Sequence, residues 1–91
     1  MENKETLFIL LVYPDGEDYC TPHPFRSMEA VKAWIEDGIR NDYRELYGND
    51  FGYVQKMEKE IADMRKAMEE RGGWRDSQGN LYDCEEREIE G

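Results

Sequence analysis

The stretch LFILLVYPDG, residues 7–16, contains the longest apolar run of the chain and ends in a turn signal. Strand-forming residues fill 7–13, and a proline, an aspartate and a glycine in succession are typical of a tight turn. Side chains alternate along a strand, so one face carries Leu7, Ile9, Leu11 and Tyr13 and the other carries Phe8, Leu10 and Val12. The run therefore predicts a strand that is apolar on both faces.

A partner strand is expected over Tyr19–Phe25, after the turn. This segment contains Pro22 and Pro24, which have no backbone N–H to donate. Prolines in sheets are confined mostly to edges. The returning segment is therefore expected to be an edge strand or an extended arm.

Two amphipathic helices are predicted in the middle of the chain. The first begins after Ser27, a typical N-cap residue, and runs to Gly48. Its apolar residues recur at helical spacing and are Val31, Trp34, Ile35, Ile39, Tyr43 and Leu46. The second begins at Asn49 or Asp50 and ends at the glycine pair 72–73. Its methionines are expected to pack in the core rather than to form an adaptable binding surface. The apolar stripe consists of Val54, Met57, Ile61, Met64 and Met68.

The stretch GGWRDSQGNLYDC, residues 72–84, indicates a helix stop followed by a hairpin, with Gly79 or Asn80 in the left-handed conformation. The element order ββααββ predicts an α+β fold in which a small antiparallel sheet of two hairpins packs against two α-helices. We expect a single domain over residues 1–91, with residues 1–5 and 86–91 disordered. The helices can cover one face of the sheet, so a homodimer is expected to cover the other.

The chain is strongly acidic, with 22 acidic and 12 basic residues and a formal net charge of -10. Nucleic acids and anionic membranes attract basic surfaces, so direct binding to either is disfavoured. The apolar run is too short for a membrane span, and the start of the chain lacks the features of a secretion signal. We therefore expect a cytoplasmic protein in which Cys20 and Cys84 are free thiols.

The acidic residues are concentrated toward the two ends of the chain, and residues 72–91 contain six acidic and two basic side chains. An acidic surface can imitate a phosphate backbone and attract a basic protein, although it also serves solubility alone. Aromatic residues beside the interhelical loop are suited to anchor an interface. The expected partner-binding residues are Asp83, Glu85, Glu86, Glu88, Glu90, Asp15, Glu17, Asp18, Tyr47 and Tyr53.

These features predict a non-enzymatic protein that needs no cofactor and that binds and inhibits a partner protein. Small acidic domains of this build look like the inhibitors and accessory proteins encoded by phages and mobile elements, in architecture and not in any motif. A basic nucleic-acid-binding protein or defence complex of a host is therefore the expected target.

A second hypothesis uses Cys20, His23 and Cys84. If the two hairpins are adjacent, these residues could hold zinc with Asp18 or Asp83 as a fourth ligand, and a disulfide between the cysteines is also open. A closely spaced ligand pair is missing, however. Residues three apart on a strand point to opposite faces, which disfavours a catalytic thiol–imidazole pair. The alternative is therefore a small metal- or ligand-binding accessory domain.

Overall fold

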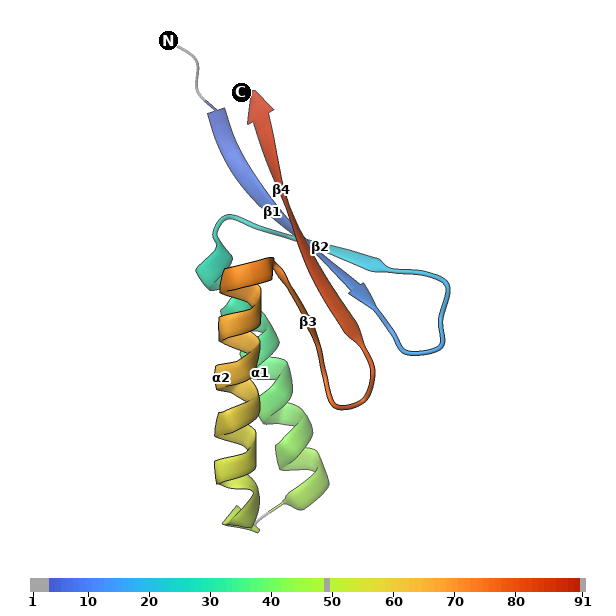
Figure 1. The fold of residues 1–91 in the computed structure, drawn as a ribbon, viewed down its shortest axis with the longest axis vertical. Coiled ribbons are helices and arrows are strands. Elements are labelled where there is room, and N and C mark those ends of the chain that lie inside the picture. Colours follow the sequence, from blue (N-terminus) through green and yellow to red (C-terminus); the bar gives the residue numbers. More distant parts are fainter. Residues whose placement is uncertain (1–3, 49, 91) are drawn as a thin grey trace.

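The computed structural model describes residues 4–48 and 50–90. It is an α+β fold in which a four-stranded antiparallel sheet carries two helices on one side (Figure 1). The elements are β1 (Lys4–Tyr13), β2 (Thr21–Phe25), α1 (Met28–Tyr47), the 3-10 helix η1 (Phe51–Tyr53), α2 (Val54–Arg71), β3 (Gly73–Arg75) and β4 (Leu81–Glu90). The predicted class and the order ββααββ are confirmed.

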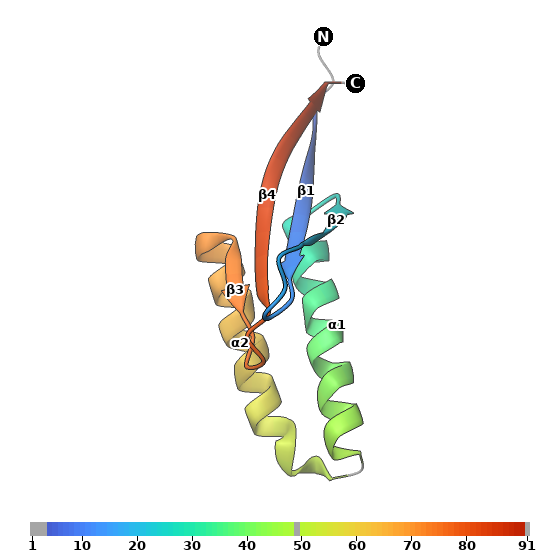
Figure 2. The same ribbon diagram turned by 90° about the vertical axis from the view of Figure 1, so that its right-hand side faces the viewer.

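Strands β1 and β4 form the centre of the sheet, whose order is β2-β1-β4-β3. They pair along their whole length, from Lys4 opposite Glu90 to Tyr13 opposite Leu81. Residues 4–5 and 86–90 are thus paired strand where the sequence predicts disorder, because the two ends satisfy each other's backbone groups. Residues 1–3 and 91 lie outside the described residues. The paired ends extend beyond the helices (Figures 1 and 2).

Strand β2 lies at an edge of the sheet, as its prolines predict. Pro22 lies opposite Leu11 of β1, and Pro24 lies opposite Ile9. Neither proline can donate a hydrogen bond to a further strand. The free edge of β2 is therefore poorly suited to strand addition.

The helix boundaries follow the predicted signals with one exception. Ser27 caps α1, its hydroxyl accepting a backbone N–H three residues on at 3.1 Å, and Gly48 follows the last turn with a φ of 58°. Gly72 ends α2 in the left-handed conformation. The predicted start of α2 at 49 or 50 is wrong, because Asp50 caps the 3-10 turn instead and α2 begins at Val54.

The core lies between the helices and one face of the sheet. Leu10 at the centre of β1 is fully buried, and the predicted methionine stripe of α2 is buried as well. Trp34, Leu46 and Val54, which share the predicted apolar faces, are instead 41%, 69% and 36% exposed. The buried helical residues are Val31, Ile35, Ile39 and Tyr43 of α1 and Met57, Ile61, Met64, Ala67 and Met68 of α2.

None of the described helices lies on the opposite face of the sheet (Figure 2). Leu7, Ile9, Leu11 and Tyr13 of β1 share this outer face and are half-buried within the single chain. The second apolar face predicted for the first strand is therefore present. Its coverage by a second copy remains a prediction, which sedimentation equilibrium would test.

Candidate functional site

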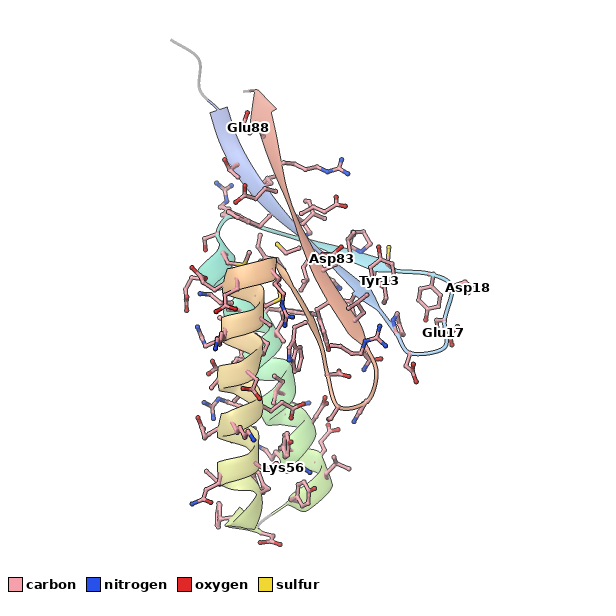
Figure 3. All side chains as sticks on the ribbon, in the orientation of Figure 1. Tyr13, Glu17, Asp18, Lys56, Asp83 and Glu88 are labelled. Atoms are coloured by element: carbon pink, nitrogen blue, oxygen red, sulfur yellow. The ribbon has the colours of Figure 1, made fainter. Side chains whose placement is uncertain are left out.

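The ten residues predicted to bind a partner fall into three groups that lie on different elements. Figure 3 labels Glu17 and Asp18 in the β1–β2 loop and Asp83 and Glu88 on β4. One group lies in the loop between β1 and β2, one lies along β4, and one lies where η1 meets the end of α1. In that order, the groups are Asp15, Glu17 and Asp18; Asp83, Glu85, Glu86, Glu88 and Glu90; and Tyr47 and Tyr53. The structure thus brings the β4 acids together and keeps them apart from the tyrosines.

The acids of β4 alternate between the two faces of the sheet. Asp83 and Glu85 share the outer face with Arg87, whose guanidinium nitrogen lies 3.3 Å from a carboxylate oxygen of Glu85. Glu86 and Glu88 share the other face. The side chain of Glu90 lies outside the described residues. No ion pair engages Asp83 or Glu86 within the part of the chain that the structure describes, so both keep unmatched charge.

Three tyrosines, Tyr43, Tyr47 and Tyr53, stack on one another at the end of the helical pair. Their ring centroids lie 5.4–5.8 Å apart, with interplanar angles of 17–19°. The hydroxyl of Tyr43 donates to a carboxylate oxygen of Glu60 at 2.6 Å, and this hydrogen bond is the main reason that the pKa of Tyr43 rises to about 12. Tyr47 and Tyr53 therefore pack together at the interhelical junction. Tyr47 is nevertheless 42% exposed.

A network of ion pairs joins α1 to α2. Arg65 of α2 is its centre, with guanidinium nitrogens 2.7 Å from Glu36 and 3.0 Å from Glu29 of α1. Hydrogen bonding to Arg65 is the main cause that lowers the pKa of both carboxyl groups. The acids of this surface are therefore neutralised by the protein itself. The remaining pairs are Lys32 with Glu29 and Glu69, and Arg40 with Glu36 and Glu58.

The β3–β4 turn packs against the loop that follows β1. The backbone N–H of Asp15 donates to the side-chain oxygen of Asn80 at 2.9 Å. Gly79 has a φ of 91°, and a β-carbon placed there would lie 2.8 Å from the carboxyl carbon of Asp15. Oδ1 of Asp76 accepts the backbone N–H groups of Gln78 and Asn80 at 2.9 and 2.8 Å. The predicted hairpin is thus confirmed, and Gly79 takes the positive φ.

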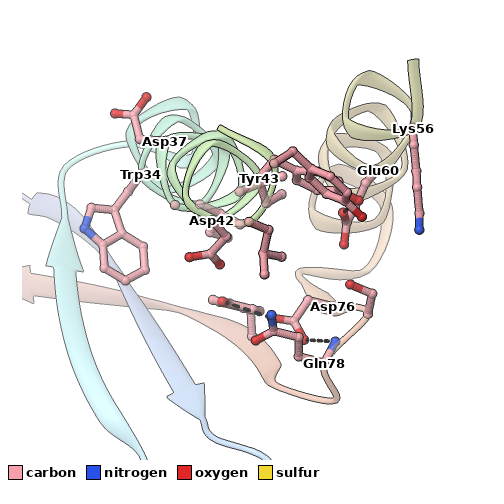
Figure 4. Close-up of a pocket in the computed structure, with 15 residues that line it drawn as sticks. Trp34, Asp37, Asp42, Tyr43, Lys56, Glu60, Asp76 and Gln78 are labelled. Atoms are coloured by element: carbon pink, nitrogen blue, oxygen red, sulfur yellow. Dashed lines mark hydrogen bonds between the residues drawn. The ribbon is translucent and has the colours of Figure 1, made fainter. Parts of the chain in front are cut away.

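A cavity of about 520 Å³ lies between α1, the first turns of α2 and the β3–β4 turn (Figure 4). Aromatic side chains form much of its lining, which includes Trp34, Tyr43, Tyr47 and Tyr82. Trp34 also packs against β2, where its ring centroid lies 4.6 Å from that of His23. Small-molecule sites typically measure about 300–1,000 Å³. The cavity is therefore large enough for an extended amino-acid side chain or a small metabolite.

Acidic groups from three elements face this cavity. Asp42 of α1 and Glu60 of α2 point toward the turn that carries Asp76 (Figure 4). Burial, followed by repulsion from nearby carboxylates that include Asp76 and Glu60, raises the pKa of Asp42. Burial, followed by the charge of Asp76, raises the pKa of Tyr82 to about 12. Lys56 is the basic residue of the described lining, so negative charge is in excess.

Reasoning from the sequence misses this cavity. Asp42 and Glu60 lie on different helices and Asp76 lies in a turn, so no local spacing marks them as a set. One signal was nevertheless present, because Asp42 directly precedes the buried Tyr43 and Glu60 directly precedes the buried Ile61. Both carboxylates therefore lie at the border of a buried helical stripe.

Cys20, His23 and Cys84 do not converge on one point. His23 and Cys84 lie opposite Leu10 on its two sides, so β1 separates their backbones by roughly 10 Å. Cys20 instead hydrogen-bonds Tyr13, which is the main cause that raises the pKa of that tyrosine. Both cysteines are free. Among residues 4–48 and 50–90, no three metal-ligating side chains are placed to hold an ion.

Comparison with known proteins identifies no relative of this chain. No protein-family model, no curated protein and no solved structure matches it. Neither α1 nor α2 is both long and apolar enough to cross a membrane. The function of the chain has to be argued from its own side chains.

Proposed function

We propose that this chain is a non-enzymatic protein of the cytoplasm that binds a positively charged partner protein and inhibits it. The observation that carries the proposal is the separation of charge on the molecule. On the helical pair, the basic side chains of the network are held in ion pairs by carboxylates of the same surface. In β4 and the β1–β2 loop, by contrast, Asp83, Glu86, Glu17 and Asp18 have no ion pair with any described residue.

Unmatched carboxylates on a chain of net charge -10 attract basic surfaces and speed their encounter. Side chains on the same face of a strand lie about 7 Å apart, so Glu86 and Glu88 form a short row of carboxylates on one face of β4, while Asp83 lies on the other face. Such a row resembles the phosphates of a nucleic acid. The target class that we propose is therefore a basic nucleic-acid-binding protein or defence complex of a host. A phage or mobile-element inhibitor would act in this way.

The test compares two double variants that lose the same amount of charge. Asp83→Asn with Glu86→Gln removes unmatched carboxylates, and Glu58→Gln with Glu69→Gln removes carboxylates of the ion-pair network. A partner captured from host lysate is identified and purified, and biolayer interferometry measures its affinity for each protein over a range of NaCl concentrations. We expect the first variant to bind about tenfold more weakly and the second to change by less than about twofold.

Inhibition is measured separately, with the purified partner and a fluorescently labelled nucleic acid that it binds. Addition of the chain should lower the fluorescence anisotropy as the nucleic acid is displaced. Affinity that does not weaken with NaCl, or equal losses in the two double variants, would contradict the electrostatic basis of the proposal. Capture of a partner whose nucleic-acid binding is unaffected would contradict the mimicry.

A further inference from the structure

The cavity between α1, α2 and the β3–β4 turn has the size of a site for an organic group. Its volume of about 520 Å³ exceeds what a bare ion occupies. Within the described part of the chain, no set of three ligating side chains is placed to hold a metal ion. A ligand for this cavity is therefore polyatomic.

The lining favours a ligand that is flat or carries an apolar stem. Trp34 and Tyr47 belong to the lining and are 41% and 42% exposed. Trp34 also packs against His23, and Tyr47 stacks with Tyr43 and Tyr53, so a ligand can contact only the exposed remainder of each residue. Ile39 and Leu46 add aliphatic surface. The faces of aromatic rings attract cations, and they stack well with planar guanidinium groups.

Four carboxylates among the described residues line the cavity, of which Asp37 points away from it (Figure 4). The other three differ in how fully the protein already uses them. Both oxygens of Asp76 accept hydrogen bonds, from the turn and from the hydroxyl of Tyr82. Glu60 accepts the hydroxyl of Tyr43 through one oxygen. Asp42 has no hydrogen bond or ion pair with a described residue, although burial and neighbouring acids raise its pKa. Asp42 is therefore the group whose charge a cation would stabilise most.

We infer that the cavity binds a guanidinium group on an alkyl chain, with Asp42 and Glu60 as its anionic partners and with Trp34 and Tyr47 as aromatic surface toward the two ends of the cavity, roughly 20 Å apart along α1. A guanidinium fits better than an ammonium because it is planar, weakly hydrated and able to form two parallel hydrogen bonds with a carboxylate. Lys56 at the rim opposes the cation and limits the affinity.

An alkylguanidinium is found both in free small molecules and in the arginine side chain of a protein. The chemistry of the cavity serves either source. The inference goes beyond the proposed function, because a free ligand binds without any partner protein. An arginine of the partner would add an anchor to the electrostatic attraction already proposed.

Binding is tested on the full chain with three probes in nuclear magnetic resonance titrations. Agmatine represents a free alkylguanidine, an acetylated and amidated Gly-Arg-Gly peptide represents a protein arginine, and the same peptide with citrulline is a neutral control of equal shape. The indole N–H of Trp34 reports on the cavity, and the backbone N–H of Thr6 on β1, outside the lining, is an internal reference. We expect saturable shifts at Trp34 with a guanidinium probe and none with the citrulline peptide.

The two guanidinium probes separate the sources of the ligand. Saturation by agmatine alone identifies a free ligand, saturation by the arginine peptide alone identifies a protein ligand, and saturation by both supports the shared head group. If neither probe binds, the inference is overturned. Salt-dependent capture of a partner would still stand in that case, so the two proposals fail separately.

Three variants locate the site. Asp42→Asn should weaken binding about tenfold, the effect of one charge-assisted hydrogen bond. Asp63→Asn removes an exposed carboxylate of α2 outside the cavity and should change the affinity less than about twofold. Lys56→Gln should strengthen binding about twofold, because it removes a repulsive charge. Equal effects of the two aspartate variants, or equal binding of the citrulline peptide, would show that the cavity does not recognise a cation.

Discussion

Glu36 and Asp42 lie on the same helix in opposite electrostatic surroundings. Glu36 meets Arg65 of α2 at 2.7 Å, and that hydrogen bond lowers its pKa. Asp42 faces the cavity, where burial and neighbouring carboxylates raise its pKa. The net charge of -10 is therefore not spread evenly over the molecule. One side of the helical pair uses its acids to hold the helices together, and the other side keeps Asp42 without a hydrogen bond or ion pair to any described residue.

Among the substitutions that test this contrast, the largest loss of stability is expected at Asp76, in the turn that closes the cavity. Asp76→Ala removes the acceptor for the N–H groups of Gln78 and Asn80 and should lower the free energy of unfolding by about 2 kcal/mol. Asp76→Asn is a partial control, because its amide oxygen still accepts these two backbone bonds, whereas its amide nitrogen cannot accept the bonds from the side chains of Asn80 and Tyr82. Urea unfolding followed by circular dichroism measures both. Equal losses would mean that the two backbone N–H bonds do not hold the turn.

A smaller loss is expected when the cavity loses the hydrogen bond between Tyr43 and Glu60. Tyr43→Phe should lower the free energy of unfolding by about 1.5 kcal/mol, because the bond is to a charged acceptor and Tyr43 is buried. The pKa of Tyr43 is about 12 when folded and near 10 when unfolded, so the contribution is complete below the unfolded value and is lost as the pH rises through the folded one. The variant should therefore approach the wild type in that alkaline range.

The control for this bond is Tyr47→Phe. Tyr47 has no hydrogen bond from its hydroxyl to a described residue, and the side chain is partly exposed. Loss of its hydroxyl should change the free energy of unfolding by less than about 0.5 kcal/mol. If this variant lost as much as Tyr43→Phe, the loss would follow the removal of any tyrosine hydroxyl from this cluster and not the bond to Glu60.

On the opposite side of the helical pair, breaking the ion-pair network should lower the free energy of unfolding by a smaller amount. Arg65→Met keeps an apolar stem and should lower the free energy of unfolding by about 0.5–1 kcal/mol, whereas Lys66→Met, at an exposed position without an ion pair among the described residues, should change it by less than about 0.5 kcal/mol. The pKa of Glu36 lies below its ordinary value of 4.5, so this contribution exists above that value and disappears as the pH falls. A deficit that persisted in acid would show that Arg65 acts through packing.

The fold could be predicted from the sequence because the signals for its elements are local. Ser27, Gly48 and Gly72 mark helix ends by their own capping chemistry, and the alternation of 7–13 marks a strand that is apolar on both faces. The start of α2 was not accessible, because Asp50 is as good a cap for a 3-10 turn as for an α-helix. The extent of strand pairing depends on the partner strand and not on the composition of either end.

The candidate site could be predicted from the sequence to a much smaller extent. The number of acidic residues in a segment singles out β4, but it does not show which carboxylates have an ion pair. On the helices, for example, Arg65 reaches Glu36 only when α1 and α2 pack with one particular rotation about their axes. The same rotation of the helices directs Asp42 and Glu60 toward the β3–β4 turn. Contacts between distant residues therefore define both sides of the comparison.

The smallest change in the free energy of unfolding is expected at Asp42, and this change is an increase. The pKa of Asp42 is raised above its ordinary value of 3.8, so the folded protein disfavours the charged form and loses stability as the pH rises through the window between the unfolded and folded values. Asp42→Asn should therefore raise the free energy of unfolding at neutral pH by about 0.3 kcal/mol, or the Tm by about 1–2 °C. Differential scanning calorimetry should show no gain at a pH below 3.8.

This gain is informative because the same substitution is expected to weaken guanidinium binding. A residue that only supports the fold would lose stability when neutralised, and a residue that only adds surface charge would behave like Asp63→Asn, with no gain and no loss of binding. A more stable protein that binds its cation more weakly is the signature of a charge kept for a ligand at the expense of the fold. If Asp42→Asn were destabilising instead, Asp42 would belong with Glu36, and the contrast between the two sides of the helical pair would disappear.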